Sequence, residues 1–483
     1  MNIKFDTHVQ QIKYRVLLEV AKDYWEGTLE EKKRQIPKII SPGPKSSVRC
    51  CIYKEREIVR DRIDLALGGD PANPNIIEVI EAACDSCPFS GIEVTDLCRG
   101  CLAHRCSGAC HRNAISFGPD LRAHIDKSLC VNCGLCAKAC PFQAITNRKR
   151  PCEAACKVNA IHPREDGISE IDESKCTRCG QCSAACPFGA IMDKSFITKA
   201  IDILKGKENS YLICAPAISS QFDWATLPQV IQGAKVLGFT DVIEAAVGAD
   251  LVAMNEAHDL IEEGFCTSSC CPAFVRYVQQ AFPTLAGNVS NNLSPMAAIG
   301  KYIKQTDPTA KCVFVGPCIA KKMEIEDPIV AQYIDCVITF EELAVLFDVR
   351  NIDLKTLPES PMDNASYFGR IFARSGGVSD AVREALKEMG SDFEVKPVVA
   401  SGLDQCKIAL TQAKNGKLPG NFIEGMACPG GCIGGPCCLL HEVRDAAQVD
   451  KYGHESKETT ISGAIASIMA DPKVATKVEK DEE

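Results

Sequence analysis

The sequence predicts an α/β domain in its C-terminal half, preceded by a cysteine-rich α+β region and a helical N-terminal segment. From about Tyr211 onward, short apolar runs such as YLICAPAI and KCVFVGP alternate with helical stretches such as VSDAVREALKEM. This alternation is typical of parallel strands joined by crossover helices. Between Cys84 and Cys186 the elements are too short for a large apolar core, so bound ligands must hold that region together.

The same reasoning divides the chain into four parts. Apolar residues recur at helical spacing from Asp6 to about Gly69, interrupted by the breaker SPGPKSS. The last residues, KVATKVEKDEE, are charged and lack an apolar face. We therefore expect a helical segment over 1–80, a cysteine-rich region over 81–200, an α/β domain over 205–470 and a solvated tail over 471–483.

Composition indicates the class of protein and the compartment in which it works. The 483 residues are 24% charged and 46% hydrophobic, as in ordinary soluble globular proteins, and the net charge of −9 argues against a nucleic-acid partner. No apolar run is long enough to span a bilayer, and the N-terminus has no secretory pattern, so we expect a cytoplasmic protein without a membrane partner. In a reducing compartment, thirty cysteines indicate metal ligands rather than disulfides.

One local charge bias stands out. Residues 31–62 contain ten Lys or Arg against four acidic residues. They form either a docking face for an acidic partner or a solvated helical surface.

Two stretches, CVNCGLCAKACP and CTRCGQCSAACP, match the ferredoxin run C-x2-C-x2-C-x3-C-P. Three thiolates of such a run hold one [4Fe–4S] cluster, and the fourth reaches a neighbouring cluster. Zinc ribbons lack the fourth cysteine before proline. The predicted ligands are Cys130, Cys133, Cys136, Cys140, Cys176, Cys179, Cys182 and Cys186.

Less regular cysteines surround these two runs. CRGCLAHRCSGAC is a stretched run that supplies Cys98, Cys101, Cys106 and Cys110. Two fragments supply a leading pair, Cys84 and Cys87, and a trailing pair, Cys152 and Cys156. Together they give sixteen thiols, enough for four cubanes. The Cys98 run would pair with the Cys130 run, and the Cys176 run with both fragments. Free thiols or a zinc site remain alternatives for the fragments, which would leave three accessory clusters.

Three further motifs lie in the α/β region in the order SSCCPAF, GPCIAKKME and MACPGGC. With them, the stretch from Tyr211 to Leu440 resembles the iron-only ([FeFe]) hydrogenase family, as a divergent subgroup with ferredoxin-like modules upstream. The resemblance implies two lobes with parallel twisted sheets and flanking helices, with the cluster between them. It also implies the H-cluster, a [4Fe–4S] cubane bridged to a diiron unit carrying CO, cyanide and a dithiolate.

By this resemblance, Cys271, Cys318, Cys428 and Cys432 would hold the cubane, and Cys432 would bridge to the diiron unit. The Pro-Gly-Gly insert between the last two would let the backbone approach the cluster closely. A plain electron-transfer cubane without a diiron unit is the alternative. The expected cofactor contacts are Pro216, Ala217, Pro317, Lys321 and Met426.

A buried ammonium at Lys321 would need an anionic partner such as a cyanide ligand, whereas Lys322 fits a surface position better. Cys270 corresponds to the family's proton-donating thiol, and a thiol suits proton transfer because its pKa lies nearer neutrality than that of a hydroxyl. Glu256 and Ser290 match the proton path behind it. Asp259 stands where glutamate is frequent, and Glu324 matches a supporting position.

The resemblance implies an enzyme that catalyses 2 H⁺ + 2 e⁻ ⇌ H₂ under anaerobic conditions. Protons and H₂ are the expected substrates, ferredoxin or a similar one-electron carrier the redox partner, and dedicated maturation proteins the source of the diiron unit. A slow hydrogen sensor and an iron–sulfur scaffold are the competing interpretations. A scaffold generally lacks the relay thiol and the cofactor lysine, which this sequence has. A pure electron carrier would not need so large an α/β domain.

Overall fold

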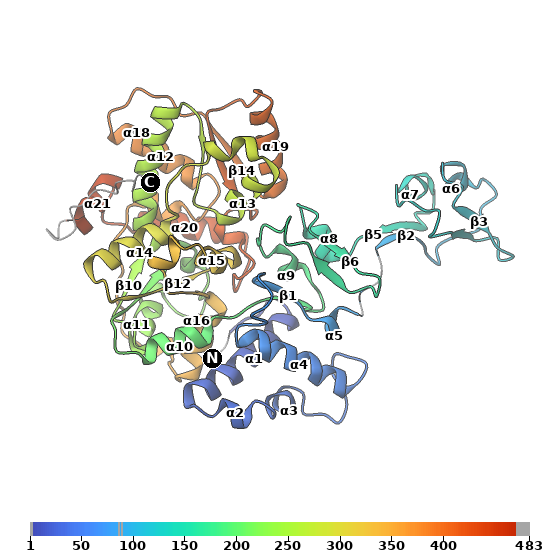
Figure 1. Cartoon of the computed structure of the whole chain (residues 1–483), viewed down its shortest axis with the longest axis horizontal. Coiled ribbons are helices and arrows are strands. Elements are labelled where there is room, and N and C mark those ends of the chain that lie inside the picture. The colour runs from blue at the N-terminus through green and yellow to red at the C-terminus, as the bar shows by residue number, and fades with distance from the viewer. Residues whose placement is uncertain (1–2, 86, 88–89, 470–483) are drawn as a thin grey trace.

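The computed structural model describes residues 3–85, 87 and 90–469, so the expected solvated tail lies outside the described residues. Figure 1 shows a large α/β region, a helical N-terminal segment beneath it, and an arm of small modules that projects to one side. The predicted fold class, an α/β region with parallel sheets joined to α+β iron–sulfur modules and a helical segment, is confirmed.

The N-terminal segment is a set of helices that packs against the α/β region. Its first helix begins where the Thr7 side chain accepts a hydrogen bond from the Gln10 amide, and ends at Gly27 with a φ of 74°. Tyr14, Leu17 and Val20 bury one face of it. The helices are α1 (His8–Glu26), α2 (Leu29–Lys32), α3 (Ile36–Ile40) and α4 (Ile52–Ala66).

The arm contains two ferredoxin-like units. The outer unit, residues 91–148, closes when its first and last strands pair antiparallel, with Gly91 opposite Arg148 and Val94 opposite Ile145. Its core is small and shared by both halves. It consists of β2 (Gly91–Val94), α6 (Arg105–Gly108), β3 (Ile115–Phe117), β4 (Ala123–Ile125), α7 (Leu135–Ala139) and β5 (Ile145–Arg148).

The inner unit closes in the same way, since Ile77 lies opposite Asp193 and Val79 opposite Ile191 in an antiparallel pair. Its chain is interrupted. After Cys87 the chain leaves to build the whole outer unit, and it returns to the inner unit at α8. The inner unit consists of β1 (Ile77–Val79), α5 (Glu81–Cys84), α8 (Pro151–Ala155), β6 (Ile161–Pro163), β7 (Ser169–Ile171), α9 (Gln181–Ala185) and β8 (Ile191–Asp193).

The first lobe of the α/β region is a four-stranded parallel sheet in the order β10-β9-β12-β13. Helix α11 begins with a capping box, in which Thr226 and Gln229 satisfy each other's backbone amides. The lobe contains α10 (Ile197–Lys205), β9 (Ser210–Cys214), η1 (Pro216–Ser220), α11 (Leu227–Leu237), β10 (Asp241–Glu244), α14 (Pro295–Thr306), β12 (Lys311–Gly316), α15 (Ile319–Glu324), η3 (Val330–Gln332), β13 (Cys336–Thr339), α16 (Phe340–Val349) and η4 (Leu354–Thr356).

The second lobe is a three-stranded parallel sheet in the order β11-β15-β14. The long helix α12 connects the lobes and packs against helices of both. The lobe contains α12 (Ala245–Glu263), β11 (Cys266–Thr267), α13 (Pro272–Ala281), η2 (Pro283–Asn288), α17 (Tyr367–Ile371), α18 (Gly377–Glu388), β14 (Pro397–Ser401), α19 (Leu403–Lys414), β15 (Phe422–Met426), η5 (Cys432–Gly434), α20 (Asp445–His454) and α21 (Ile461–Met469).

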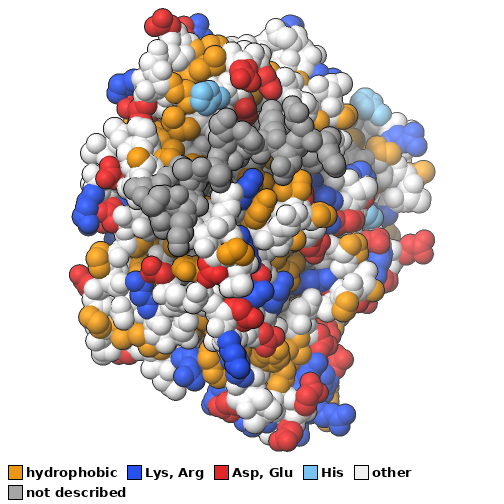
Figure 2. Space-filling model, turned by 60° about the vertical axis from the view of Figure 1, so that its left-hand side comes forward, with side chains coloured by type: hydrophobic (Ala, Val, Ile, Leu, Met, Phe, Trp, Pro, Cys, Tyr) orange, Lys and Arg blue, Asp and Glu red, His pale blue; other side chains and the backbone are white. Residues whose placement is uncertain are grey.

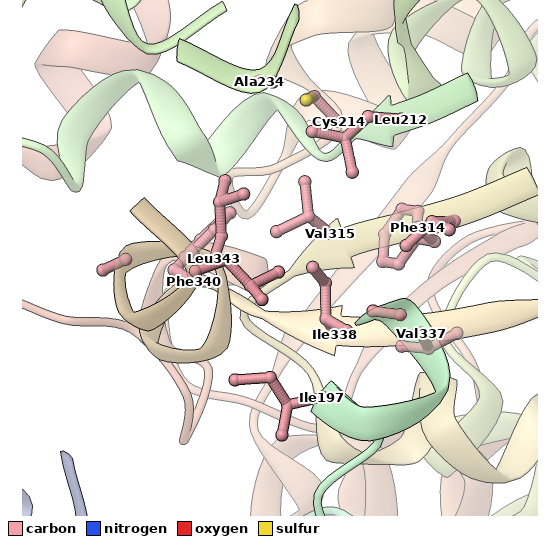
Figure 3. Packing of buried hydrophobic residues seen from close by; sticks show 14 of the residues in the cluster. Ile197, Leu212, Cys214, Ala234, Phe314, Val315, Val337, Ile338, Phe340 and Leu343 are labelled. Atoms are coloured by element: carbon pink, nitrogen blue, oxygen red, sulfur yellow. The ribbon is translucent and has the colours of Figure 1, made fainter. Parts of the chain in front are cut away.

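The main core lies in the first lobe, between its sheet and the covering helices. Figure 3 shows Val315 of β12 and Ile338 of β13 directed toward Phe340 and Leu343 of α16. Cys214 of β9 is buried in the same cluster, so this thiol serves as a small apolar side chain. On the face shown in Figure 2, acidic and basic side chains are interspersed.

Candidate metal-cluster active site

Four cysteines stand where parallel strands of both lobes end. Cys271 follows β11 and precedes α13, and Cys318 follows β12 and precedes α15. Cys428 and Cys432 follow β15. Sites in open parallel sheets form at the carboxyl ends of strands, because the loops there converge from different strands. The two lobes therefore bring three separate sequence motifs to one place.

The thiols of these cysteines lie close enough to influence one another. Burial, together with the nearby thiols of Cys271 and Cys432, raises the pKa of Cys318 to about 12. Burial also raises the pKa of Cys428 well above its usual value, with added contributions from Cys318 and Cys271. Four neighbouring, part-buried thiols that would repel one another as thiolates suit a polynuclear cation, because metal binding deprotonates its cysteine ligands.

The donors at this site are all cysteine thiols. Among the residues that the structure describes, no three His, Cys, Asp or Glu side chains converge as the ligands of one ion do. Iron–sulfur cubanes are larger than one ion and take four cysteine thiolates. The all-cysteine donor set therefore fits a [4Fe–4S] cluster.

The Pro-Gly-Gly insert is shaped by its protein neighbours. Gly430 and Gly431 have φ values of 82° and 91°, which side-chain-bearing residues rarely adopt. A Cβ at Gly431 would stand 2.8 Å from the carbonyl oxygen of Ala373, and the Gly430 carbonyl accepts a hydrogen bond from the Ser375 amide at 2.9 Å. The expectation that these glycines serve the approach to a cluster is therefore incomplete, because protein backbone already requires them.

Lys321 is buried beside the cysteines and has a protein partner. Its Nζ donates to Glu324 Oε2 at 2.6 Å, across one turn of α15. Burial acts to lower its pKa, but the Glu324 carboxylate and the thiols of Cys318 and Cys270 outweigh burial and raise the pKa. Glu324 is thus the protein partner of Lys321, which is held as a cation next to the cysteines.

The surface position expected for Lys322 is wrong. Lys322 is fully buried and donates to Asp193 Oδ2 at 2.9 Å and Glu342 Oε1 at 3.0 Å. Burial acts to lower its pKa, but the two carboxylates raise it. Asp193 belongs to β8 of the inner unit and Glu342 to α16, so this ammonium ties the iron–sulfur arm to the first lobe.

The expected cofactor contacts surround the same strand ends. Pro216 and Ala217 open η1 directly after β9, and Ala217 is fully buried. Pro317 lies between β12 and Cys318, and its carbonyl accepts from the Cys437 amide at 3.1 Å. Met426 ends β15, is buried, and packs in a cluster that includes Cys270 and Cys271.

The expected relay begins with the part-buried Cys270 and the fully buried Glu256. Burial raises the pKa of Cys270 well above its usual value, and the nearby Glu256 carboxylate raises it further. Glu256 lies on α12, is fully buried, and accepts through Oε1 from the Ser269 amide at 2.9 Å. Its Oε2 has no hydrogen-bond partner among the described residues. Burial raises the pKa of Glu256 to about 8, so this carboxyl is neutral at pH 7 and can donate a proton.

Farther along α12, the second acid meets the expected serine. Ser290 Oγ donates to Asp259 Oδ2 at 2.8 Å. Asn292 Nδ2 donates to the same oxygen at 2.9 Å and to Ser290 Oγ at 2.6 Å. Asp259 and Glu256 stand one turn apart on the helix, and the Asp259 charge contributes to the raised pKa of Glu256. Sequence reasoning missed Asn292, although it follows Ser290 closely in VSNNLSP.

In the outer unit, each of the two cysteine runs lies close to the last cysteine of the other run. Burial raises the pKa of Cys106, as do the thiols of Cys140 and Cys101. Burial likewise raises the pKa of Cys136, as do the thiols of Cys130 and Cys110. Two cavities are each lined by three cysteines of one run and the last cysteine of the other run. The first is lined by Cys98, Cys101, Cys106 and Cys140, and the second by Cys110, Cys130, Cys133 and Cys136.

The inner unit reunites the two fragments with the Cys176 run. The thiols of Cys84 and Cys186 contribute to the raised pKa of Cys87, after burial. The Ser169 amide donates to Cys84 Sγ at 3.3 Å, and the Ser169 hydroxyl lies 3.7 Å from Cys152 Sγ. The pKa of Cys182 is raised by burial and then by four thiols of the unit, Cys179, Cys176, Cys156 and Cys152.

The fragments are therefore the two halves of one run, C-x2-C and C-x3-C, separated by the inserted outer unit. The local spacings of the leading and trailing pairs were the sequence signal for this split.

The inner unit also touches the four-cysteine site. Gln181 lies in the Cys176 run, directly before Cys182. Its Nε2 donates to Cys428 Sγ at 3.5 Å and to the Gly434 carbonyl at 3.5 Å. The Cys179 thiol contributes to the raised pKa of Cys428. Sequence reasoning missed Gln181. Its contact makes the inner unit the immediate neighbour of the site.

Comparisons with known proteins find related sequences for two parts of the chain. Residues 208–436 match the family "Iron only hydrogenase large subunit, C-terminal domain", and residues 123–146 and 169–192 match the "4Fe-4S binding domain". Iron hydrogenase 1 of Clostridium pasteurianum is 28% identical over 300 residues, which cover 50% of this chain and 52% of that protein.

Other matches are shorter or more distant. The cytosolic Fe-S cluster assembly factor NAR1 of Kluyveromyces lactis is 34% identical over 94 residues, 20% of each protein. A variant of apo [FeFe]-hydrogenase HydA1 from Chlamydomonas reinhardtii aligns with a TM-score of 0.48 and 22% identity, over 57% of this chain and 93% of that one. The chain spans about half the length of the curated relatives it matches. None of the helices in the described part of the chain has the length and apolar character needed to cross a bilayer.

Proposed function

Because this chain belongs to an iron-only hydrogenase-like family, we propose that it catalyses the reversible reaction 2 H⁺ + 2 e⁻ ⇌ H₂ at the four-cysteine site. The supporting observation is the meeting of Cys271, Cys318, Cys428 and Cys432 at the strand ends, with the cation Lys321, the part-buried Cys270 and the buried Glu256 beside them. We place the reaction in an anaerobic cytoplasm.

The four cysteines would hold a [4Fe–4S] cubane, and Cys432 would bridge it to the diiron unit. When bound, that unit supplies the chemistry by which hydrogen is split or formed heterolytically. Lys321 would hold an anionic ligand of the unit, while Pro216, Ala217, Pro317 and Met426 would exclude water around it.

Protons would move through the chain's own groups. The Cys270 thiol would exchange a proton with the site, and Glu256 would exchange one with Cys270 through its unpartnered oxygen. Asp259, Ser290 and Asn292 form the next connected group. Among the described residues no hydrogen bond joins Glu256 to this outer group, and a water would bridge them.

Electrons would travel through four accessory clusters. In the outer unit, Cys98, Cys101, Cys106 and Cys140 would hold one, and Cys110, Cys130, Cys133 and Cys136 the second. In the inner unit, Cys84, Cys87, Cys152 and Cys186 would hold the third, and Cys156, Cys176, Cys179 and Cys182 the fourth. The last set would pass electrons to the active site near Gln181 and Cys428.

A non-catalytic iron–sulfur scaffold is the second candidate, and the match to an assembly factor favours it. A slow hydrogen sensor would share the site of the enzyme. The rate of hydrogen turnover would distinguish the enzyme from the scaffold and from the sensor.

The test is hydrogen evolution from reduced methyl viologen under strict anaerobiosis. Protein loaded with the diiron unit by the maturation proteins is compared with protein that carries only its cubanes. Activity confined to the loaded form supports the enzyme. Cys270→Ala is the matched variant, because it removes the relay thiol and keeps every proposed ligand. A loaded protein without turnover would refute catalysis and leave the scaffold.

A further inference from the structure

The outer unit projects farthest from the rest of the molecule (Figure 1). It is inserted between Cys87 and Cys152, so the inner unit could close without it, as the β1–β8 pairing shows. The outer unit therefore adds two cysteine sets to an arm that already reaches the active site. Of the two, the set of Cys98, Cys101, Cys106 and Cys140 is the distal one, because its cavity lies toward the β3–β4 turn.

The outer unit is basic in an acidic protein. Residues 91–148 contain seven Lys or Arg and four Asp or Glu, a net charge of +3, whereas the whole chain carries −9. Arg99 and Arg105 are exposed at the distal set, and neither forms an ion pair among the residues that the structure describes. Two acids of the outer unit are engaged elsewhere, since Asp96 pairs with Arg122 at 3.3 Å and Asp120 lies 3.3 Å from His124.

The basic residues of the N-terminal segment differ from Arg99 and Arg105 in having partners. Several of them are used within the protein, so this segment is a poorer docking face than its composition suggests. Ion pairs engage Lys32, Lys33, Lys54 and Arg60, and backbone carbonyls accept from Arg49, Arg56 and Arg62.

Exposed apolar side chains gather on the same unit. Seven of the sixteen large apolar side chains that are exposed in the described residues lie between residues 91 and 148, so a short stretch has a large share of them. At the distal set they are Leu97, Leu102, Leu121 and Phe142, and Leu102 is 96% exposed. We call these four, with Arg99 and Arg105, the tip patch.

The tip patch lies directly over the distal cysteine set. The cavity lined by those four cysteines is also lined by Arg99, Arg105 and Phe142. A protein seated on the patch would thus be separated from a cluster in that cavity by single side chains. Apolar residues with unpaired arginines around them are the composition of a transient protein interface.

We propose that the tip patch is the docking surface for an acidic one-electron carrier protein, which exchanges electrons with the distal cluster. This inference rests on the proposed function, because the clusters connect the carrier to a reaction only if the four-cysteine site is the active site. Acidic residues around the carrier's redox centre would face Arg99 and Arg105, and its apolar contacts would cover Leu102 and Phe142. One electron passes per encounter, and the carrier and the distal cluster change oxidation state oppositely.

The test uses the full chain loaded with iron–sulfur clusters and an acidic two-[4Fe–4S] ferredoxin as the probe. Arg99→Glu with Arg105→Glu reverses the charge of the patch. Lys407→Glu with Lys414→Glu makes the same charge change on exposed positions of α19, where neither lysine has an ion pair within the described residues and Ile408 is an exposed apolar neighbour.

Leu121→Asp removes apolar surface without touching a cysteine motif. Leu121 has a φ of 62°, a region that aspartate adopts more readily than leucine. This variant keeps the proposal testable if the arginine reversals disturb cluster assembly.

Stopped-flow electron transfer from reduced ferredoxin to protein without the diiron unit gives the first readout. We expect the second-order rate constant to fall about tenfold or more in the arginine variant at low ionic strength, and to stay near the parent value in the lysine control. Salt should lower the parent rate. Reduction by methyl viologen should be equal in all variants, because a small mediator needs no docking surface.

Hydrogen evolution gives the second readout, with a raised KM for ferredoxin and an unchanged rate with methyl viologen. If tip-dependent electron transfer occurs without hydrogen evolution, the proposed function fails and the docking surface stands. Equal ferredoxin rates in parent, arginine and Leu121→Asp proteins would overturn the docking surface. So would an oligomer of the parent chain that the tip variants dissociate, because a second copy would then cover the patch.

Discussion

Replacement of Glu256 by Gln tests the buried carboxyl on which the proposed proton path depends. Glutamine has nearly the shape of a protonated glutamate, can keep the acceptor bond from the Ser269 amide, and cannot ionise. The variant therefore separates two properties of Glu256 that the structure combines. One is its capacity to transfer a proton, and the other is the cost of burying a carboxylate.

The stability effect follows from the raised pKa. The carboxyl has a pKa of about 8 in the folded protein, against an ordinary value of 4.5. Between these values the unfolded chain releases a proton that the folded chain keeps, so the group's contribution to stability is lost as pH rises. At pH 7 the difference amounts to about 3 kcal/mol as an order of magnitude. Glu256→Gln should remove this pH dependence, raise the thermal midpoint at pH 7, and leave it unchanged at pH 4.

Activity should change in the opposite direction. A positioned acid or base contributes about 10²- to 10⁴-fold, so hydrogen evolution should fall by about this factor although the variant is more stable. The assays are circular dichroism melting of the cluster-loaded protein at both pH values and hydrogen evolution from methyl viologen. Glu262→Gln makes the same change at an exposed position of α12 and serves as the control. A Glu256→Gln protein with full turnover, or with no gain in stability at pH 7, would refute the reasoning.

Three further predictions follow from the same contacts. Chemical analysis of protein without the diiron unit should find about 20 iron atoms per chain, and Cys152→Ala should lower the value by about four; about 16 in the parent would contradict the reunited run. Gln181→Leu removes the hydrogen bond to Cys428 Sγ and should make the active-site cubane harder to reduce, as a redox titration followed by electron paramagnetic resonance would show; an unchanged potential would deny Gln181 this role. Lys322→Met leaves Asp193 and Glu342 without their shared cation and should cost about 3–5 kcal/mol in urea unfolding, whereas a loss below about 1 kcal/mol would mean that the buried pairs contribute little.

Motifs that are contiguous in the chain were readable from the sequence. The Cys130 and Cys176 runs have fixed ligand spacings, since neighbouring thiolates of one run must reach the same cluster. The alternation of apolar runs and helices predicted parallel strands, and the structure has two parallel sheets. The order of the three motifs around Cys271, Cys318 and Cys428 indicated the family before any geometry was available.

The sequence could not decide contacts between distant segments. Lys321 and Lys322 are adjacent and chemically identical, yet one faces the cysteines and the other joins Asp193 and Glu342, because only the packing of α15 between the arm and the lobe separates their surroundings. Gln181 acquires its role from Cys428, far along the chain.

The split run shows the same limit most clearly. Ligand spacing within Cys84–Cys87 and within Cys152–Cys156 is local and is set by backbone reach, so the sequence by itself showed that both pairs match parts of a ferredoxin-type run and left free thiols or a zinc site as alternatives. Their membership in one unit depends on the closure of β1 against β8 around an inserted domain. That closure is a long-range pairing whose stability comes from burial in three dimensions, and only the tertiary structure decided it.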